Sequence, residues 1–516
     1  MLRIVGTRFK TIRRYNSIRF VSRVPHDANS ISNRRSTIVS QVGQYYPAID
    51  QVRNKFNGKL MRISQFVEKF GSDTDLGNTR GSEYNLEGRI TGIRVLSKGL
   101  FFMDLIQDDV TVQIKAYNKL VGLEKHEFGE INSWFKIGDY VSCNGFASRT
   151  PAGELTLTLT NHIEMLSPIL QEIPNKLVDK GVINSNRSVN YLVNPDSKLP
   201  IIVKSQLIQA IRQFFIGLQF LEVQTPILSG EGTGANAAPF ITHMKDTPVR
   251  LRVAPELWLK KLVIGGFDRV FEIGPNFRNE GIDRSHNPEF TSCEFYQAFT
   301  SLTELMSLTE ELFAHLYKSL PMDHLKSFAS PFPKYEFIPT IEQRTGIALP
   351  EKYTVETLSQ YFHQIGLELP SNPTPVSLLD KLSEVYLESI SAETPNTPII
   401  IYNQPEIMSP LAKSSQGISH RFELFINGQE YVNAYEEENC PLDQYEKFKI
   451  QQSAKIEYND DECVVPDWEY VKSMEYGLPP TGGWGCGIDR LAMLISGCTR
   501  IDQVLPFGNL RDVIRQ

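Results

Sequence analysis

Residues Phe277–Phe290 read FRNEGIDRSHNPEF, and residues Gly483–Arg490 read GWGCGIDR. The first stretch places Arg, His and Phe along a turn between two short runs of strand type. The second is a glycine-rich passage from a strand into a helix, and it ends in another Arg. Polyanions need fixed cations, a flat base stacks on an aromatic ring, and glycine lets the backbone approach a ligand closely. Together the two stretches predict a pocket for a nucleoside triphosphate.

The usual phosphate-binding loops are missing, because the sequence contains neither GxxxxGK[ST] nor a GxGxxG that follows a strand. The two stretches instead resemble motifs 2 and 3 of the class II aminoacyl-tRNA synthetases, subclass IIb, and the first is most similar to the lysyl branch. The resemblance extends from about Met61 to the C-terminus. It implies an α+β fold, in which an N-terminal OB-fold β-barrel precedes a catalytic domain with an antiparallel sheet flanked by helices.

Residues 1–40 have the composition of a mitochondrial transit peptide. No Asp or Glu occurs between Met1 and His26, and apolar residues alternate with basic ones. The basic residues are Arg3, Arg8, Lys10, Arg13, Arg14, Arg19 and Arg23. We therefore predict import into the mitochondrial matrix and cleavage before Gln41; the alternative is a basic tail that contacts RNA.

Length and charge limit the other possibilities. A chain of 516 residues is long enough for two or more domains. Residues 1–49 carry a net charge of +8, and the whole chain carries −7. The remaining residues therefore carry about −15, so RNA must be bound by a local patch. No apolar run approaches the roughly 18 residues that span a bilayer, and we expect no membrane insertion. The six cysteines lack metal-ligand spacing, so we expect no zinc.

Residues 60–168 alternate apolar and polar side chains between turn signals, which predicts a small β-barrel. Barrels of the OB type bind single-stranded bases by stacking and by hydrogen bonds to base edges. The resemblance implies an anticodon-binding domain with Arg89, Phe102 and Gln113 as contact residues, Phe102 stacking a base and Gln113 reading an edge. A lone Phe that merely fills the barrel is the alternative. Residues 169–190 read as a polar, proline-containing linker.

Residues 191–516 form the predicted catalytic domain, with a helical insertion around residues 302–398. Near its start, apolar residues recur at helical spacing and give one buried stripe. The stripe consists of Val203, Leu207, Ile211, Phe214, Phe215 and Leu218. With the extended segment FLEVQTPIL it resembles class II motif 1, which implies a homodimer.

Lysine carries two ammonium groups and one carboxylate, so a selective pocket needs several acids and a fixed cation. We expect these acids to face an open cavity away from Lys or Arg partners, because buried unpaired carboxylates signal a cationic ligand. Glu294 and Tyr296 are two apart and share one face of a strand. The resemblance implies that Gly234 and Glu256 hold the α-amino group. It further implies a substrate site that includes Glu294, Tyr296, Asn433, Tyr435 and Glu437, with Tyr296 and Glu437 at the ε-ammonium and Asn433 with Arg278 at the carboxylate.

For ATP, the resemblance implies that Arg278 bridges the α-phosphate and the attacking carboxylate, while His286, with Arg284, holds the outer phosphates. Phe290 and Arg490 stack on the two faces of adenine. Glu423 and Glu430 match the magnesium-binding acids, and hard oxygen ligands suit Mg²⁺. Arg278 and Arg490 are thus the predicted catalytic residues, for ATP-dependent activation of L-lysine and its transfer to tRNA(Lys).

Several positions depart from the family pattern. They are Thr233 and Ala238 in TGANAAPF, Pro275 before NFRNE, and Cys440 after EEEN. None removes a predicted contact residue, so they bear on substrate affinity. An aspartyl or asparaginyl enzyme of the same subclass is the nearest alternative, and a non-catalytic RNA-binding relative is a more distant one.

Overall fold

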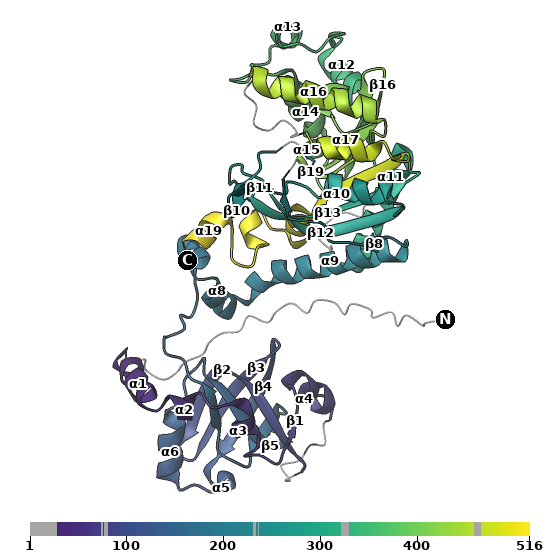
Figure 1. Ribbon diagram of the computed structural model, residues 1–516. Coiled ribbons are helices and arrows are strands. Elements are labelled where there is room, and N and C mark those ends of the chain that lie inside the picture. The colour runs from purple at the N-terminus through teal and green to yellow at the C-terminus, as the bar shows by residue number, and fades with distance from the viewer. Residues whose placement is uncertain are drawn as a thin grey trace. The chain divides into compact units, whose positions relative to one another are not determined.

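The computed structural model describes residues 28–73, 76, 81–230, 234–235, 237–320, 330–458 and 466–515. These residues form two compact units, and the chain passes from one to the other between Asp196 and Ser197. Figure 1 shows the strands and helices of each unit. Among the described residues, no helix combines the length and the apolar character that a membrane span requires.

The N-terminal unit is a closed barrel of five strands. The strands pair in the order β2-β3-β4-β6-β5, and β5 pairs back with β2, so the ring has no open edge. Their bounds are β2 Glu83–Ser97, β3 Leu100–Gln107, β4 Val110–Tyr117, β5 Tyr140–Arg149 and β6 Leu155–Leu159. This ring confirms the predicted β-barrel, and the short strands β1 (Lys59–Leu60) and β7 (Glu164–Ser167) extend it.

The N-terminal unit also contains short helices. They are α2 Val42–Tyr45, α3 Ile49–Arg53, α4 Ile63–Phe70, α5 Asn118–Val121, α6 Lys125–Ser133, α7 Lys180–Ser185 and α8 Arg187–Val193. Alternation along β3 sends Phe101, Met103 and Leu105 into the barrel core, where Ile63 and Phe66 of α4 meet them. Helices α7 and α8 fall in and just after the segment predicted as a linker, whose boundaries stay a prediction.

Helix α1 (Ala28–Ser40) lies within the predicted leader and is nevertheless packed into the N-terminal unit. Ile38 is buried, and the buried Arg34 donates to Asp139 Oδ2 at 2.7 Å. The Asp139 carboxylate also accepts from the backbone N–H groups of Lys136 and Ile169 at 2.8 and 2.9 Å. The segment from Ala28 onward is therefore part of the folded unit, while residues 1–27 of the predicted leader lie outside the described residues.

The C-terminal unit is built on an eight-stranded sheet in the order β14-β15-β18-β19-β20-β13-β12-β8. Adjacent strands are antiparallel except for the two outermost pairs, β14 with β15 and β12 with β8. The bounds are β8 Leu221–Glu222, β12 Arg269–Phe277, β13 Glu289–Ala298, β14 Lys334–Glu336, β15 Ile399–Tyr402, β18 Arg421–Ile426, β19 Gln429–Glu436 and β20 Thr481–Gly487. The predicted antiparallel sheet with flanking helices is confirmed.

Helices cover this sheet in two apolar clusters. In the larger cluster, α9 (Leu199–Gly217), α11 (Leu302–Ser319) and α18 (Ile488–Ser496) pack on Phe271, Phe295 and Trp484. In the other, α10 (Glu256–Ile264), α16 (Pro441–Tyr458) and α17 (Trp468–Met474) pack around Tyr296. Figure 1 shows α9 running along one side of the sheet. The predicted α9 stripe is buried at Val203, Leu207, Ile211 and Phe215.

The predicted helical insertion around residues 302–398 is not one body. Its first helix, α11, belongs to the main core, whereas the later helices enclose a smaller core of their own around Phe337, Phe362 and Leu379. These are α12 Phe337–Thr345, α13 Val355–Ile365, α14 Pro375–Ser383 and α15 Ser389–Glu393, with a π-helical turn at Glu384–Glu388. The remaining short elements of the unit are β9 Leu228–Ser229, β10 Ile241–Met244, β11 Thr247–Leu251, β16 Ser414–Ser415, β17 Ile418–Ser419 and α19 Leu510–Ile514.

We expect Asp139→Asn to destabilise the N-terminal unit by about 3 kcal/mol, because the change leaves the buried Arg34 cation uncompensated. The new side-chain N–H₂ also faces N–H groups of Arg34, Lys136 and Ile169, which can only donate. The control is Asp108→Asn, whose pair with Arg62 is about half exposed, and which we expect to change stability by less than about 1 kcal/mol. Urea unfolding followed by hydrogen exchange of β5 in the intact chain measures both. Equal stability of the two variants would contradict the structural role of α1.

Candidate active site

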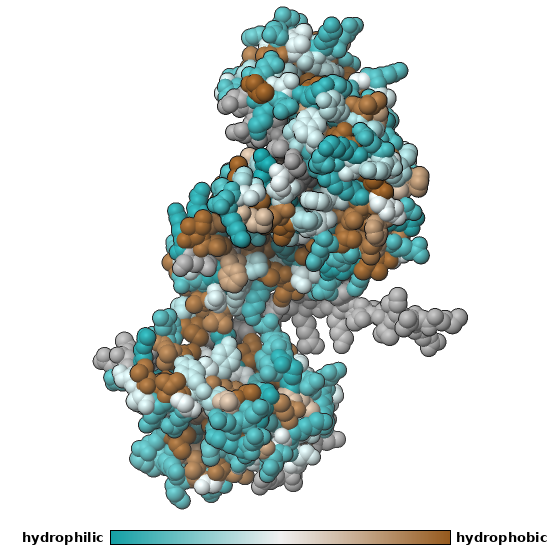
Figure 2. Space-filling model, in the orientation of Figure 1, coloured by the Kyte–Doolittle hydropathy of each residue, from teal (hydrophilic) through white to brown (hydrophobic). Residues whose placement is uncertain are grey.

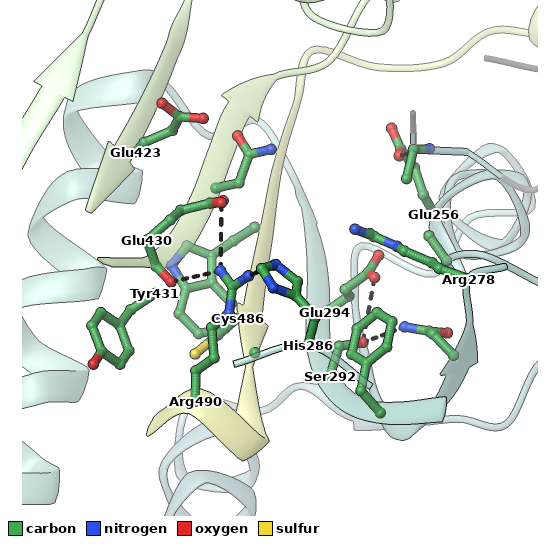
Figure 3. Close-up of a pocket in the computed structure, with 18 of the residues that line it drawn as sticks. Glu256, Arg278, His286, Ser292, Glu294, Glu423, Glu430, Tyr431, Cys486 and Arg490 are labelled. Carbon is green, nitrogen blue, oxygen red and sulfur yellow. Dashed lines mark hydrogen bonds and ion pairs between the residues drawn. The ribbon is translucent and has the colours of Figure 1, made fainter. Parts of the chain in front are cut away.

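A cavity of about 460 Å³ opens over the centre of the eight-stranded sheet. Its walls come from β13, β18, β19 and β20 and from the turn between β12 and β13. In the view of Figure 3, Glu256, Arg278 and Glu294 lie toward one end, Glu423 and Glu430 toward the other, and His286 and Arg490 between them. The structure thus brings the two decisive sequence stretches together in one place.

Arg278 follows directly on β12 and is held by the hairpin that β12 forms with β13. The Arg278 backbone N–H donates to the Pro288 carbonyl at 2.8 Å, which fixes the base of the intervening loop. The guanidinium carbon lies 5.1 Å from the centre of the Phe290 ring, in a cation–π contact. Its buried Nε has no hydrogen-bond partner within the described structure. A buried guanidinium with spare donors at a cavity wall is suited to an anionic ligand.

His286 and Arg490 contact each other across the cavity. Arg490 Nη2 lies 2.5 Å from His286 Nε2, and His286 Nδ1 lies 2.7 Å from Asp283 Oδ2. An arginine can only donate, so Nε2 accepts and Nδ1 carries the proton toward Asp283. Hydrogen bonds from Ser285 and His286 outweigh the effect of partial burial and lower the pKa of Asp283 to about 2. The face of Phe290 is covered by Arg278, so stacking of adenine between Phe290 and Arg490 stays a prediction.

Asp489 anchors helix α18 beneath the site. Its Oδ2 accepts from the Thr291 backbone N–H at 2.7 Å, and its Oδ1 accepts from Lys204 Nζ of α9 at 2.5 Å. Asp489 is buried, and Arg490 is the next residue. The ion pair therefore ties α18 to α9, and the bond from Thr291 ties it to β13. From this position Arg490 reaches the cavity, where its Nη1 donates to the Glu430 carbonyl at 3.2 Å.

Glu294 and Tyr296 lie on the same face of β13, as the alternation predicts, and both line the cavity. Tyr296 Oη lies 3.4 Å from Glu294 Oε2. Among the described residues Glu294 has no Lys or Arg ion-pair partner. Burial, reinforced by the charge of Glu256, raises the pKa of Glu294 to about 8 in spite of Arg278 and Arg252. This carboxyl is therefore poised to ionise when a cation enters.

Glu256 begins helix α10 and faces the same end of the cavity. Its Oε1 accepts from Tyr435 Oη at 2.6 Å, and its Oε2 accepts from the Ala235 backbone N–H at 3.3 Å. Gly234 has φ of 99°, and a Cβ at this position would lie 2.6 Å from Glu256 Oε2. Only glycine adopts this conformation readily and leaves the carboxylate its space. Gly234, Glu256 and Tyr435 are thus brought together as predicted.

Lys260 was missed by the sequence reasoning. It lies one turn after Glu256 on α10, is fully buried, and pairs with Glu256 Oε1 at 2.9 Å and with Glu437. Burial alone would lower the pKa of Lys260, but the two carboxylates raise it above its usual value. The expectation that the acids face the cavity without Lys or Arg partners is therefore wrong for Glu256 and Glu437. The i, i+4 spacing of Glu256 and Lys260 was the available signal.

Glu437 lies behind the cavity wall and is not among the residues that line it. A Cβ added to Gly483 would lie 1.8 Å from Glu437 Oε1 and 2.6 Å from the Tyr296 ring. The glycine of the GWGCGIDR stretch therefore makes room for an acid and a tyrosine of the predicted lysine pocket. This close approach explains why glycine is required here.

The two predicted metal-binding acids lie on adjacent strands at the other end of the cavity. Glu423 Oε1 accepts from Arg421 Nη2 at 2.5 Å, and Arg421 Nε donates to Asn433 Oδ1 at 3.0 Å. Partial loss of hydration and the negative charge of Glu423 raise the pKa of Glu430. In the described part of the chain, no three His, Cys, Asp or Glu side chains are grouped closely enough to hold a metal ion.

In the N-terminal unit, Arg89, Phe102 and Gln113 lie on three adjacent strands and outside the barrel core, and Arg89 is buried there by other parts of the unit. Phe102 is opposite Arg94 and Lys115, and Gln113 is opposite Asp104. Phe102 is partly exposed, and it is absent from the barrel core that contains its neighbours Phe101 and Met103. Gln113 is buried and bonds to Glu154 and Thr156 at 2.6 and 3.0 Å. The geometry permits stacking on Phe102, which stays a prediction.

Comparison with known proteins identifies the family. The family described as tRNA synthetases class II (D, K and N) matches residues 179–511. The mitochondrial lysine–tRNA ligase of Schizosaccharomyces pombe is 38% identical over 504 residues, which are 94% of this chain and 93% of that protein. The mitochondrial lysine–tRNA ligase of Saccharomyces cerevisiae is 36% identical over the same shares, and the lysine–tRNA ligase of Streptococcus mutans is 39% identical over 90% of this chain and 95% of its own. The chain belongs to the class II tRNA synthetases of the D, K and N group.

Proposed function

We propose that this protein is a lysine–tRNA ligase, which uses ATP to activate L-lysine and transfers it to the 3′ end of tRNA(Lys). The observation that carries the proposal is a single cavity with the carboxyls of Glu256 and Glu294 next to the Arg278 guanidinium. Two ammonium groups and one carboxylate of lysine match this arrangement of charges. The substrate named for the relatives is the same.

In the first step the lysine carboxylate attacks the α-phosphorus of ATP, the bond to the β-phosphate oxygen breaks, and lysyl-adenylate and pyrophosphate form. In the second step the terminal 3′-hydroxyl of tRNA attacks the acyl carbon, loses its proton, and releases AMP. Positioning and charge neutralisation supply the catalysis, and no side chain is assigned as a general base.

The proposed contacts follow the two ends of the cavity. Gly234, Glu256 and Tyr435 surround the α-amino group, and Glu294, Tyr296 and Glu437 stabilise the ε-ammonium. Asn433 and Arg278 orient the carboxylate. Arg278 also neutralises the α-phosphate, because its side chain lines the cavity. His286, with Arg284, contacts the outer phosphates, while Phe290 and Arg490 stack on adenine once Arg278 turns from the Phe290 ring to the substrate.

Glu423 and Glu430 fit a Mg²⁺ ion that accompanies ATP. They supply carboxylate oxygens. Burial and then repulsion from Glu423 raise the pKa of Glu430, and a divalent cation relieves the repulsion. When bound, the ion would neutralise phosphate charge. The adjacent Arg421 holds Glu423 in place, with Nη2 at 2.5 Å from its carboxylate.

The outer barrel face with Arg89, Phe102 and Gln113 is the proposed anticodon-binding surface. Phe102 lies opposite Lys115 and opposite Arg94, which pairs with Asp104 at 3.0 Å, and an aromatic platform beside a cation suits single-stranded RNA. The chain as a whole is acidic, so recognition depends on such local patches.

A homodimer and a location in the mitochondrial matrix complete the proposal. The α9 stripe is covered by its own sheet, but nearby apolar side chains remain exposed, and hydrophobic patches interrupt the hydrophilic surface in Figure 2. Leu228, Ile241 and Met244 are 49, 65 and 61% exposed. Such an apolar surface suits association with a second copy.

The names of the two fungal relatives and the acid-free N-terminus support import into mitochondria.

Amino-acid-dependent exchange of pyrophosphate into ATP tests the activity. We expect exchange with lysine and none with aspartate or asparagine. Arg278→Ala should reduce lysine-dependent exchange by at least about 10³-fold, since it removes the cation at the reacting phosphate. Arg269→Ala, at the opposite end of β12, is the control and should retain activity. Exchange driven by aspartate, or normal exchange in Arg278→Ala, would contradict the proposal.

The pKa of Glu294 predicts how lysine binding depends on pH. In the empty site this carboxyl is neutral below about pH 8, and it must lose its proton to pair with an ammonium group. The KM for lysine should therefore fall about tenfold per pH unit as the pH rises from 6.5 to 7.5, and level off above about pH 8. Glu294→Gln should remove this dependence, whereas Glu289→Gln, at an exposed position on β13, should keep it. A parallel pH dependence in Glu294→Gln would refute the assignment.

Phe102→Ala tests the anticodon surface. We expect the KM for tRNA to rise by about tenfold, because stacking of one base contributes about 1 to 3 kcal/mol. Lysine-dependent pyrophosphate exchange should not change, since that reaction takes place in the other unit. Leu120→Ala, which removes an exposed apolar side chain of the same unit, is the control. An unchanged KM for tRNA in Phe102→Ala would exclude the stacking role.

A further inference from the structure

Lys260 is the most unusual charged group near the active site. Its side chain is completely buried on α10, and its Nζ is surrounded by protein groups. Those groups are the carboxylates of Glu256 and Glu437, together with the rings of Tyr435 and Tyr470 at 5.8 and 5.7 Å. A buried ammonium costs several kcal/mol of hydration unless it is paired, so its position between two acids is specific.

The charges around Lys260 correspond to those of the proposed substrate. Glu256, Glu294 and Glu437 together carry three negative charges when ionised, and Lys260 offsets one of them. Two negative charges remain for the two ammonium groups of lysine. The substrate carboxylate is left to Arg278, which lines the same cavity. With lysine bound, the formal charges of the three glutamates, Lys260, Arg278 and the substrate sum to zero.

We propose that Lys260 is a positioning residue for the amino-acid site, which holds the Glu256 and Glu437 carboxyls in place and offsets one negative charge, so that the remaining charge of the site matches two ammonium groups. The inference rests on the proposed lysine specificity. Lys260 lies behind the cavity wall and does not contact the substrate, so it acts through the two carboxylates. Tyr435 supports the same arrangement by donating to Glu256 Oε1 at 2.6 Å.

The adjacent residue Lys261 provides a matched control. It is on the same helix and is also ion-paired, but its Nζ contacts Asp467 at 2.8 Å and is partly exposed. Burial already raises the pKa of Glu437, and Lys260 opposes that effect, so Lys260→Met raises this pKa further and weakens the attraction of the Glu437 carboxyl for the ε-ammonium. We expect the KM for lysine in pyrophosphate exchange to rise at least about tenfold, with the KM for ATP unchanged. Lys261→Met should change neither value by more than about twofold.

A second comparison separates this role from a merely structural one. In Glu437→Gln the Lys260 cation faces one carboxylate fewer and repels the substrate ammonium. Adding Lys260→Met to Glu437→Gln should therefore lower the KM for lysine, the opposite of its effect in the wild-type background. A residue needed only for folding would raise the KM in both backgrounds. If Lys260→Met alone does not fold, the KM for lysine of Glu437→Gln and that of the double variant still distinguish a positioning role from a structural one.

The proposal is overturned if Lys260→Met folds with a KM for lysine within about twofold of wild type, or if the double variant has a KM equal to or above that of Glu437→Gln. Thermal unfolding of each variant monitors the fold. Absence of lysine-dependent exchange in the wild-type protein would instead refute the proposed function, so the two failures are distinguishable.

Discussion

The ion cluster of Lys260 with Glu256 and Glu437 is the constraint on which the amino-acid end of the cavity depends. Carboxylates removed from water are stable only when charge or hydrogen bonds compensate them. In this protein one cation is shared by two acids, and Glu294 is left to a raised pKa instead of an ion pair. The empty site therefore has an uncompensated acid, and in the proposed function the ammonium groups of lysine compensate it.

The backbone around this cluster is adapted to it. Gly234 and Gly483 stand where any Cβ would collide with Glu256 or Glu437, so two chain segments far apart in the sequence approach the acids closely. The cationic side chains of the cavity are held in a different way. Arg278 and Arg490 supply donors for an anion, His286 accepts from Arg490, and Asp489 ties the helix that carries Arg490 to Lys204 of α9 and to the β13 backbone.

The two units differ in the side chains that they present outside their cores. The barrel encloses an apolar core and leaves Phe102 between the cationic residues Arg94 and Lys115 on its outer face. The eight-stranded sheet encloses its core on one side and offers polar and charged side chains to the cavity on the other. Helix α1 shows that the N-terminal unit extends further toward the start of the chain than the composition of residues 1–40 suggests, since Arg34 compensates the buried Asp139.

The sequence by itself determined the family, the barrel and sheet, and most of the charged residues that line the cavity. The sequence signals are local. They are strand alternation, helical periodicity and the stretches Phe277–Phe290 and Gly483–Arg490, and the placement of Glu294 and Tyr296 on one strand face follows from the alternation. Only the tertiary structure decided which acids are paired. Lys260 meets Glu437 across 177 residues of sequence, and Arg490 meets His286 across 204. Ion pairs of this kind depend on how separate elements pack and on the burial that results, neither of which a local pattern contains.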